Sequence, residues 1–578
     1  MNLMPSGASP PRSPRVSTSD PPVSSYNHLI RPLLTDLYQI TMCYAYWKSE
    51  RHAISSAFDL FFRKSPFGGE FTIFAGLSEV LAFVDKWRLD ESDILYLREE
   101  MLPHAEPEFF DYLRALDCSE VRVYSVHEGS VVFPREPLMR IEGPLGICQL
   151  LETTILNLTN FASLVCTNAA RMRKAAGDSA TLLEFGLRRA QGPDGAVSAS
   201  RYAYMGGFDG TSNVLAGQLF GMPVKGTHAH AFVCSFSGIE DLLRTTLRAA
   251  PAQQGRSTQE HDILKEVIAL RRKFKWTATN MGELCAFISY AQAFPNGFLA
   301  LIDTYDTLCS GVRNFLLVAY VLHQLGYAPI GVRLDSGDLA WLSLECRAIF
   351  ETFAREHDVP SFARLKIVAS NDINESILVS LQDQGHSIDA FGIGTNLVTC
   401  QAQPALGMVY KLVEIDGKPR IKLSNDISKI TIPGRKNMYR LIGKKGIPLI
   451  DVILKCDESP PEPGKKMLCC HPFDAGKRVY VTPAAVLPLI FCWRKGMEAQ
   501  QQEEGDESEE KHGASALFLP PSPSLDELRN FTKDQLQMMR PDHLRAVNPT
   551  PYKIAVSVTL HSFLHDLWAK EQPIAELE

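Results

Sequence analysis

The stretch Val332-Arg333-Leu334-Asp335-Ser336-Gly337-Asp338 is an apolar run that stops abruptly in charged and small residues. Further runs end in the same manner near Gly186, Thr227, Asp303, Ser370 and Ile393. Helical patterns separate several of them, most clearly over residues 312–325 and 339–355. Alternating strands and helices build a parallel sheet, closed or doubly wound. Because polar residues follow the strands, we predict a TIM-like α/β barrel with its active site at the strand ends.

The composition is that of an ordinary globular protein. The chain has 578 residues, of which 45% are hydrophobic and 22% charged, and its net charge is −7. A negative charge argues against general nucleic-acid binding, and no apolar run is long enough to span a membrane. The 13 cysteines contain no C-x-x-C pair. An odd, irregular set of cysteines favours reduced thiols, so we expect a cytoplasmic protein that binds neither nucleic acid nor membrane.

The character of the sequence changes along the chain. A β-rich segment lies at 121–143, and shorter strands are predicted at 410–413, 420–423 and 439–441. A charged insert at 240–275 predicts additional helices. We expect a disordered Ser/Pro-rich extension at 1–27, an α+β sheet domain at 28–155, an α/β catalytic domain at 156–404, and a C-terminal segment at 405–578 that includes an acidic loop at 498–512 and a helical tail.

Arg333, Asp335 and Asp338 form the strongest local signal for chemistry. An arginine at a strand end suits bidentate binding of a carboxylate or phosphate. The two carboxylates suit a metal ion or sugar hydroxyls. The alternative is that the Asp-Ser-Gly-Asp turn only caps the next helix.

His230 closes the run from Lys225 to His230, and Asp303 and Asp306 follow another strand. These carboxylates suit Mg²⁺, could orient His230 instead, or could simply cap a helix. We interpret His228 as structural. No hydrolase signature, P-loop or full dinucleotide fingerprint is present.

Two further strand ends suit anionic ligands. Gly392-Ile393-Gly394-Thr395 is typical of a phosphate cradle, because glycines let backbone N–H groups approach an anion. Glu184-Phe185-Gly186-Leu187-Arg188-Arg189 places an aromatic ring beside two arginines, which suits a flat anionic ring or a phosphate. The alternative for the second motif is a strand end with surface arginines.

Six pieces of the sequence together resemble one enzyme family. They are Leu34 to Gln39, Phe67 to Gly69, Gly186 to Gly195, Gly206 to Asp209, Gly226 to His230, and Val332 to Asp338. The family is nicotinate phosphoribosyltransferase, the ATP-dependent enzyme that makes nicotinate mononucleotide and pyrophosphate from nicotinate and 5-phosphoribosyl 1-pyrophosphate for NAD synthesis. The resemblance implies a barrel packed against an open-faced sheet domain, which the N- and C-terminal segments build together. It also implies a homodimer with a shared active site.

The resemblance also implies roles for individual residues. His230 would be phosphorylated by ATP, and Asp303 would belong to the catalytic set. Tyr38, arriving from the other subunit, and Phe185 would sandwich the pyridine ring. The remaining expected contacts are Arg333 and Thr227 with the nicotinate carboxylate; Arg188, Gly394 and Thr395 with phosphates; Asp335 with ribose hydroxyls; and Asn371 and Gly392 with substrate. Mg²⁺ or Mn²⁺ would neutralise the pyrophosphate, and its ligands cannot be assigned from the sequence.

Ser212 bears on the choice of substrate. Relatives that use nicotinamide carry an aspartate in a Gly-Thr-Asp-Thr-Val-Ala-Gly stretch, where this chain has Ser212. An aspartate would repel a carboxylate, so serine favours nicotinate. Three alternatives remain: the same reaction on nicotinamide or quinolinate, a barrel enzyme acting on another phosphosugar, and an inactive homologue that serves as an interaction protein.

Overall fold

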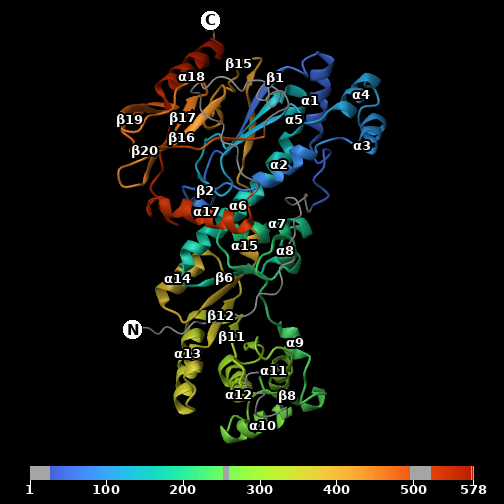
Figure 1. Ribbon diagram of the computed structural model, residues 1–578, viewed down its shortest axis with the longest axis vertical. Coiled ribbons are helices and arrows are strands. Elements are labelled where there is room, and N and C mark those ends of the chain that lie inside the picture. The colour runs from blue at the N-terminus through green and yellow to red at the C-terminus, as the bar shows by residue number, and fades with distance from the viewer. Residues whose placement is uncertain (1–26, 251–259, 495–522, 575, 577–578) are drawn as a thin grey trace, which may run out of the picture.

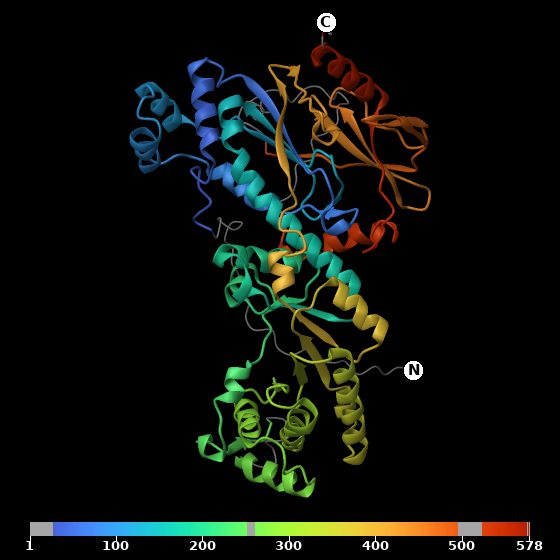
Figure 2. The same ribbon diagram turned by 180° about the vertical axis from the view of Figure 1, so that it is seen from behind.

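The computed structural model describes residues 27–250, 260–494, 523–574 and 576. A sheet-rich part, built from both ends of the chain, and an α/β part, built from its middle, follow each other along the long axis (Figure 1). Helix α6 (Glu152–Ala176) extends from one part toward the other (Figure 2). The predicted acidic loop at 498–512 and nearly all of the predicted extension at 1–27 lie outside the described residues.

The α/β part contains a six-stranded sheet in the order β10-β11-β12-β13-β6-β7. Every neighbouring pair is parallel, which confirms the predicted parallel sheet. The strands are β6 (Thr181–Glu184), β7 (Gly210–Thr211), β10 (Leu299–Leu301), β11 (Gly331–Leu334), β12 (Lys366–Ser370) and β13 (Ala390–Ile393). The helices are α7 (Gly192–Met205), α8 (Val214–Phe220), α9 (His230–Cys234), α10 (Ile263–Lys273), α11 (Met281–Ala293), α12 (Val312–Gln324), α13 (Leu339–Glu356), α14 (Glu375–Gln384) and α15 (Thr395–Thr399).

The prediction of a strand that ends near Thr227 is wrong. In its place, Val224 forms an isolated parallel bridge to Thr211. Thr211 N–H donates to Pro223 O at 3.0 Å, and Lys225 N–H donates to Thr211 O at 2.8 Å. Pro223 itself has no N–H to donate, which limits a longer ladder. The chain leaves the sheet after Lys225 and reaches His230 as an irregular segment.

The first antiparallel sheet mixes strands from both chain ends in the order β15-β14-β1-β5-β3-β21. Its strands are β1 (Ser55–Phe61), β3 (Arg122–Ser125), β5 (Met139–Pro144), β14 (Val409–Ile415), β15 (Lys418–Pro419) and β21 (Phe491–Arg494). Beside it lie β2 (Thr72–Ile73), β4 (Val131–Val132), α1 (Leu37–Lys48), α2 (Leu77–Lys86), α3 (Glu91–Tyr96), α4 (Pro107–Ala115) and α5 (Leu145–Leu150). Asp416 and Gly417, between β14 and β15, have φ values of 52° and 66°, as is typical of a tight hairpin turn.

The sheet-rich part contains a second six-stranded sheet, in the order β19-β18-β22-β17-β16-β20. Its strands are β16 (Lys436–Ile442), β17 (Pro448–Lys455), β18 (Met467–His471), β19 (Asp474–Val481), β20 (Ala485–Pro488) and β22 (Ile554–Ser557). The helical tail is α17 (Leu525–Met538) and α18 (Val558–Glu571). The predicted boundary between residues 155 and 156 falls inside α6, so the division into domains stays a prediction.

Two other sequence predictions need correction. Residues 420–423 form no strand, because Lys422 N–H donates to the side chain of Thr431 at 3.0 Å rather than to a neighbouring strand. The insert at 240–275 contains the predicted helical structure in α10, but β8 (Thr246–Arg248) and β9 (Glu260–Asp262) also pair in an antiparallel arrangement there.

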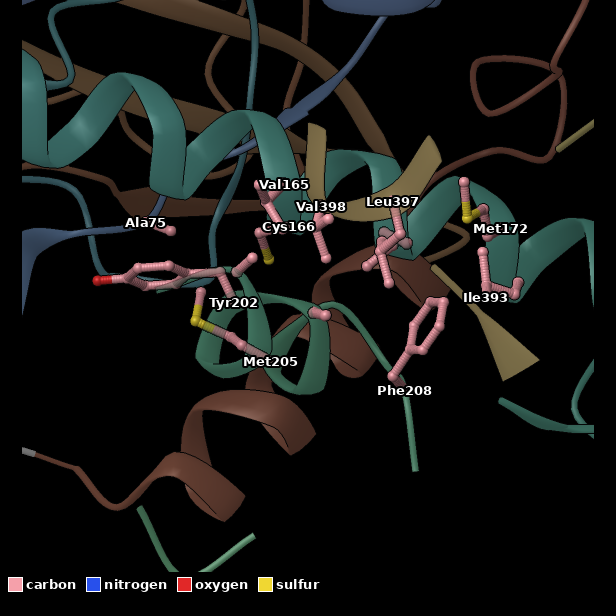
Figure 3. Packing of buried hydrophobic residues seen from close by; sticks show 14 of the residues in the cluster. Ala75, Val165, Cys166, Met172, Tyr202, Met205, Phe208, Ile393, Leu397 and Val398 are labelled. Atoms are coloured by element: carbon pink, nitrogen blue, oxygen red, sulfur yellow. The ribbon is translucent and has the colours of Figure 1, made fainter. Parts of the chain in front are cut away.

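The two parts share a continuous core where α6, α7 and α15 meet. Figure 3 shows Tyr202 and Met205 of α7 packed beneath Val165 and Cys166 of α6. A side chain at Gly206 would place its Cβ 2.5 Å from the carbonyl oxygen of Cys166, so α6 and α7 approach closely only because residue 206 is glycine. Among the described residues, no helix is both long and apolar enough to cross a membrane.

Candidate active site

Four predicted residues meet at the carboxyl ends of β10 and β11. His230 Nε2 lies 3.9 Å from Asp303 Oδ1 and 3.6 Å from Asp335 Oδ2. Arg333 Nη2 lies 3.8 Å from Asp335 Oδ1. His230 is the first residue of α9, and its side chain is 42% exposed. An accessible imidazole beside two carboxylates can act as a nucleophile or exchange protons.

The carboxylate of Asp303 holds the neighbouring strand-end residues in place. Its side chain is only 2% exposed, and Oδ2 accepts hydrogen bonds from Asp335 N–H at 2.9 Å and from Ser336 Oγ at 2.5 Å. Oδ1 is buried and has no hydrogen-bond partner. Asp335 also accepts a hydrogen bond from Ser370 Oγ. The strand-end turns are therefore held in place by carboxylates, and one buried acceptor remains available.

Arg333 faces the same space as a buried cation with unused donors. Burial lowers the pKa of its guanidinium, against the opposing effect of Asp335. Its Nη1 donates to the carbonyl of His228 at 3.4 Å, whereas Nε is buried without a partner. Thr227 Oγ1 is likewise buried and unpaired. Buried polar groups without partners cost free energy, so these donors are suited to an anionic ligand.

Phe185 lies beside this cluster at the end of β6. Its ring centroid is 6.0 Å from Arg333 Cζ. A Cβ at Gly392 would lie 2.4 Å from the Phe185 ring, so glycine at this position leaves room for the aromatic side chain. Ser212 follows β7, and its N–H donates to Glu184 O at 2.9 Å. The structure thus brings Ser212 to the strand end that precedes Phe185.

Sequence reasoning missed the role of Glu184 in this region. Its buried carboxylate accepts hydrogen bonds from Ser200 Oγ at 2.8 Å, Thr211 Oγ1 at 2.6 Å and Gly186 N–H. These contacts tie β6, α7 and β7 together. An acid that terminates an apolar strand was the available signal.

The predicted phosphate site is only partly assembled by direct contacts. Thr395 is the first residue of α15 and follows Gly394. Thr395 Oγ1 accepts a hydrogen bond from Arg189 at 3.3 Å, so Arg189 rather than Arg188 contacts this threonine. Arg188 is close enough to Arg333 to lower the pKa of that guanidinium, although burial contributes more. Asn371, just after β12, has a φ of 96°, a backbone conformation that a non-glycine residue rarely adopts.

Tyr38 lies apart from these residues within one chain. It is the second residue of α1, in the sheet-rich part, and is 50% exposed. It lines a cavity of about 350 Å³ together with Asp36, Thr153, Asn157 and Phe161. The predicted residues at the parallel-strand ends do not line this cavity.

His228, interpreted as structural from the sequence, joins two elements of the site. Its Nε2 accepts a hydrogen bond from Leu301 N–H at 3.3 Å. Burial, followed by the electrostatic effects of Arg333 and His230, lowers the pKa of His228 to about 4. The ring is therefore neutral near pH 7 and belongs to the site's architecture.

The remaining candidate acids have structural roles. Asp338 accepts a hydrogen bond from Trp341 N–H at 3.0 Å and Asp306 accepts one from Cys309 N–H at 2.5 Å, so both cap helical turns. Within the described ranges, no group of three or more His, Cys, Asp or Glu residues has the arrangement of a metal site.

Comparisons with known proteins cover almost the whole chain. A family model for the nicotinate phosphoribosyltransferase N-terminal domain matches residues 33–160, and one for the C-terminal domain matches residues 435–564. Nicotinate phosphoribosyltransferase 2 of Arabidopsis thaliana is 52% identical over 96% of this chain and 97% of its own length. The human nicotinate phosphoribosyltransferase is 43% identical over 94% of this chain and 98% of its own length.

Solved structures show the same relationship. The crystal structure of human nicotinic acid phosphoribosyltransferase matches with a TM-score of 0.80 and 41% identity, covering 92% of this chain and 99% of that one. The nicotinate-nucleotide pyrophosphorylase of Pyrococcus furiosus matches with a TM-score of 0.54 and 20% identity, covering 89% of this chain and 97% of that one. The second likeness concerns the fold alone.

Proposed function

Because the chain belongs to the nicotinate phosphoribosyltransferase family, we propose that it transfers a phosphoribosyl group from 5-phosphoribosyl 1-pyrophosphate to nicotinate, coupled to ATP hydrolysis. The pyridine nitrogen bonds to C1 of the ribose, and the bond from C1 to pyrophosphate breaks. The products are nicotinate mononucleotide and pyrophosphate, the first step from nicotinate to NAD. The observation that carries the proposal is the meeting of His230, Arg333 and two carboxylates at the parallel-strand ends.

Nicotinate binding rests on the unused donors beside Phe185. Arg333 Nε and Thr227 Oγ1 are buried and unpaired, so a carboxylate satisfies both. The Phe185 ring, near the Arg333 guanidinium, stacks on the pyridine. Ser212 leaves this region without the negative charge that an aspartate would introduce, which favours nicotinate over nicotinamide.

The phosphoribosyl donor occupies the neighbouring strand ends. Arg188, Gly394 and Thr395 bind its phosphates, and Asp335 binds ribose hydroxyls. Gly392 and Asn371 complete the substrate-binding set. Since departure of pyrophosphate leaves positive charge on the ribose and negative charge on the leaving group, these residues act by positioning and charge stabilisation.

Asp303 and Asp335 fit Mg²⁺ or Mn²⁺, because Asp303 Oδ1 is a buried acceptor without a partner and carboxylate oxygens suit hard cations. Donor phosphates and water would supply the other ligands. A bound divalent cation would neutralise the pyrophosphate leaving group.

His230 is the proposed site of phosphorylation by ATP. Nδ1 lies 3.1 Å from Thr304 Oγ1, which leaves Nε2 to attack the γ-phosphorus. The bond to the β-phosphate oxygen breaks, ADP leaves, and later hydrolysis releases phosphate. The phosphohistidine adds negative charge and acceptor oxygens beside Asp303 and Asp335, where it strengthens binding of the cation complex of the donor.

Tyr38 completes the site in a homodimer. It is half exposed and lies on α1, in the sheet-rich part. Within one chain, α1 is far from the strand ends that hold nicotinate (Figure 1). A second protomer that presents Tyr38 to Phe185 gives the pyridine ring aromatic contact on both faces.

Closure of the parallel sheet into an irregular barrel is part of the same proposal. The edge strands are β7 and β10. The irregular segment 224–228 bridges to Thr211 of β7 at one end, and its His228 accepts a hydrogen bond from Leu301 of β10 at the other. This segment therefore supports closure of the sheet between β7 and β10. It does so through one β-bridge and one side-chain hydrogen bond, without a complete ladder of backbone hydrogen bonds. The barrel strand ends then surround one active site.

We also propose a cytoplasmic location, which the odd, irregularly spaced set of 13 cysteines supports. The activity is tested by incubating the full chain with the phosphoribosyl donor, Mg²⁺ and each of nicotinate, nicotinamide and quinolinate, with and without ATP. Nicotinate mononucleotide formation, increased by ATP, is the expected result. Preference for either other pyridine would contradict the assigned substrate, and no product from any of them would contradict the reaction.

A further inference from the structure

A second large cavity lies in the sheet-rich part, away from the parallel-strand ends. It has a volume of about 630 Å³ and is bounded by the loop at 133–135 and by strands β17, β18, β19 and β22. Its apolar wall includes Ile432, Ile450, Val479 and Tyr552. A cavity of this size is ordinary for a small-molecule site. The proposed reaction assigns no role to any residue that lines it.

The charged groups around this cavity are mostly basic. Its lining contains Arg135, Lys477, Arg478 and Lys553, against the single carboxylate of Glu70. Burial lowers the pKa of His471, which also lines the cavity. Lys477 has a partner, because its Nζ lies 3.2 Å from Asp474 Oδ2. Arg135 and Lys553 form no ion pair with any described residue. Burial raises the pKa of Glu70. The cavity therefore has an unbalanced positive charge.

Arg135 gives the clearest indication that the positive charge of this cavity serves to bind a ligand. Its φ is 71°, a conformation that costs a non-glycine residue about 1 kcal/mol or more. Its N–H donates to Phe62 O at 2.7 Å, and its Cζ lies 4.6 Å from the Phe473 ring centroid. Nη1 is nevertheless buried and has no partner. Burial lowers the pKa of Arg135, and Arg63 lowers it further, whereas the carboxylate of Asp426 opposes both effects.

We propose that this cavity binds an organic phosphate of about mononucleotide size, with the phosphate on Arg135 and Lys553 and the apolar body against Tyr552. An anion satisfies the unpaired Nη1 and removes the repulsion among the cations. The apolar wall explains why an organic phosphate should bind better than phosphate alone. The site is additional to the catalytic one and does not depend on the proposed reaction.

Hydrogen exchange of the full chain tests the proposal, with AMP, inorganic phosphate and adenosine as probes. We expect AMP to protect segments 471–479 and 551–555, and adenosine at the same concentration to leave them unchanged. If adenosine protected these segments as much as AMP does, the assignment of an anion site would be overturned. If inorganic phosphate protected them as much as AMP does, the cavity would not recognise the organic part of the ligand. Protection confined to the parallel-strand ends would overturn this proposal and leave the proposed function untouched.

Two variants identify the groups that bind the phosphate. Arg135→Gly removes the guanidinium and tolerates the positive φ, so the backbone is not strained further. Lys553→Met is the second variant, and Lys445→Met, at an exposed turn, is the matched control. The AMP concentration for half-maximal protection should rise roughly tenfold in both cavity variants and stay unchanged in the control. Unchanged AMP binding in both cavity variants would refute the proposal.

Discussion

His228 Nε2 accepts a hydrogen bond from the backbone N–H of Leu301 at 3.3 Å. Leu301 ends β10, an edge strand of the parallel sheet, so this contact holds the irregular segment before His230 against the strand ends. The carbonyl of His228 also accepts a hydrogen bond from Arg333 Nη1 at 3.4 Å. One residue therefore connects the segment that leads to His230, the sheet edge and Arg333.

Replacing His228 tests this connection. His228→Leu should raise the KM for nicotinate about tenfold, because the Leu301 N–H loses its acceptor and the segment can shift. His228→Gln supplies a carbonyl acceptor at a similar reach and should return the KM to within about threefold of wild type. Steady-state kinetics checks both variants. A leucine variant with wild-type KM would show that the contact positions nothing.

Arg333→Ala should reduce kcat/KM for nicotinate roughly 30-fold or more, since truncating one partner of a buried charge pair costs about 2–5 kcal/mol. The matched control is Arg355→Ala, an exposed arginine on α13. Initial rates over a nicotinate series measure the effect. A value within twofold of wild type would refute carboxylate binding by Arg333.

Ser212→Asp should shift specificity from nicotinate toward nicotinamide. The new carboxylate repels the acid and can accept the amide N–H, so the ratio of the two kcat/KM values should move by about tenfold or more. Ser212→Asn is the control, because asparagine has the size of aspartate but carries no charge. If aspartate leaves the ratio where asparagine does, Ser212 does not face the substrate's acidic group.

His230→Ala should abolish ATP hydrolysis and the gain from ATP, while slow ATP-independent synthesis persists. The residual rate comes from Arg333, Arg188 and the bound divalent cation, which the substitution leaves in place. An acid-labile phosphate on wild type, absent from the variant, is the expected signal. ATP hydrolysis by His230→Ala in step with product formation would falsify the proposed role.

Glu283 predicts a pH dependence of stability. Burial raises the pKa of this carboxyl to about 7, against hydrogen bonds from Ser310 and Asn314. Since the folded pKa exceeds the unfolded one, its contribution to stability is complete below about pH 4.5 and is lost as the pH rises through 7. Glu283→Gln should therefore be stabilised relative to wild type at pH 8, by about 1–3 kcal/mol.

Urea unfolding of wild type and Glu283→Gln at pH 5 and pH 8 measures this difference. The two proteins should differ less at pH 5, where Glu283 is mostly protonated in the folded state. A gap in unfolding free energy that stays constant between the two pH values would mean that Glu283 titrates normally.

Local sequence patterns determined much of the fold. Helices α12 and α13 and the strand ends at Asp303, Leu334, Ser370 and Ile393 were predictable, because hydrophobic periodicity and abrupt polar ends are properties of neighbouring residues. The prediction of a strand near Thr227 was wrong, because a strand needs a pairing partner. The partner here, Thr211, lies outside the few neighbouring residues from which the strand was predicted.

The sequence by itself also determined which residue types stand at the strand ends, and so which ligands suit them. Only the tertiary structure decided that Asp306 and Asp338 cap helical turns while Asp303 and Asp335 face His230. It also decided that His228 remains neutral and bonds to a residue 73 positions away. The physical reason is that burial, desolvation and unsatisfied hydrogen bonds depend on residues far apart in the chain, which no local pattern specifies.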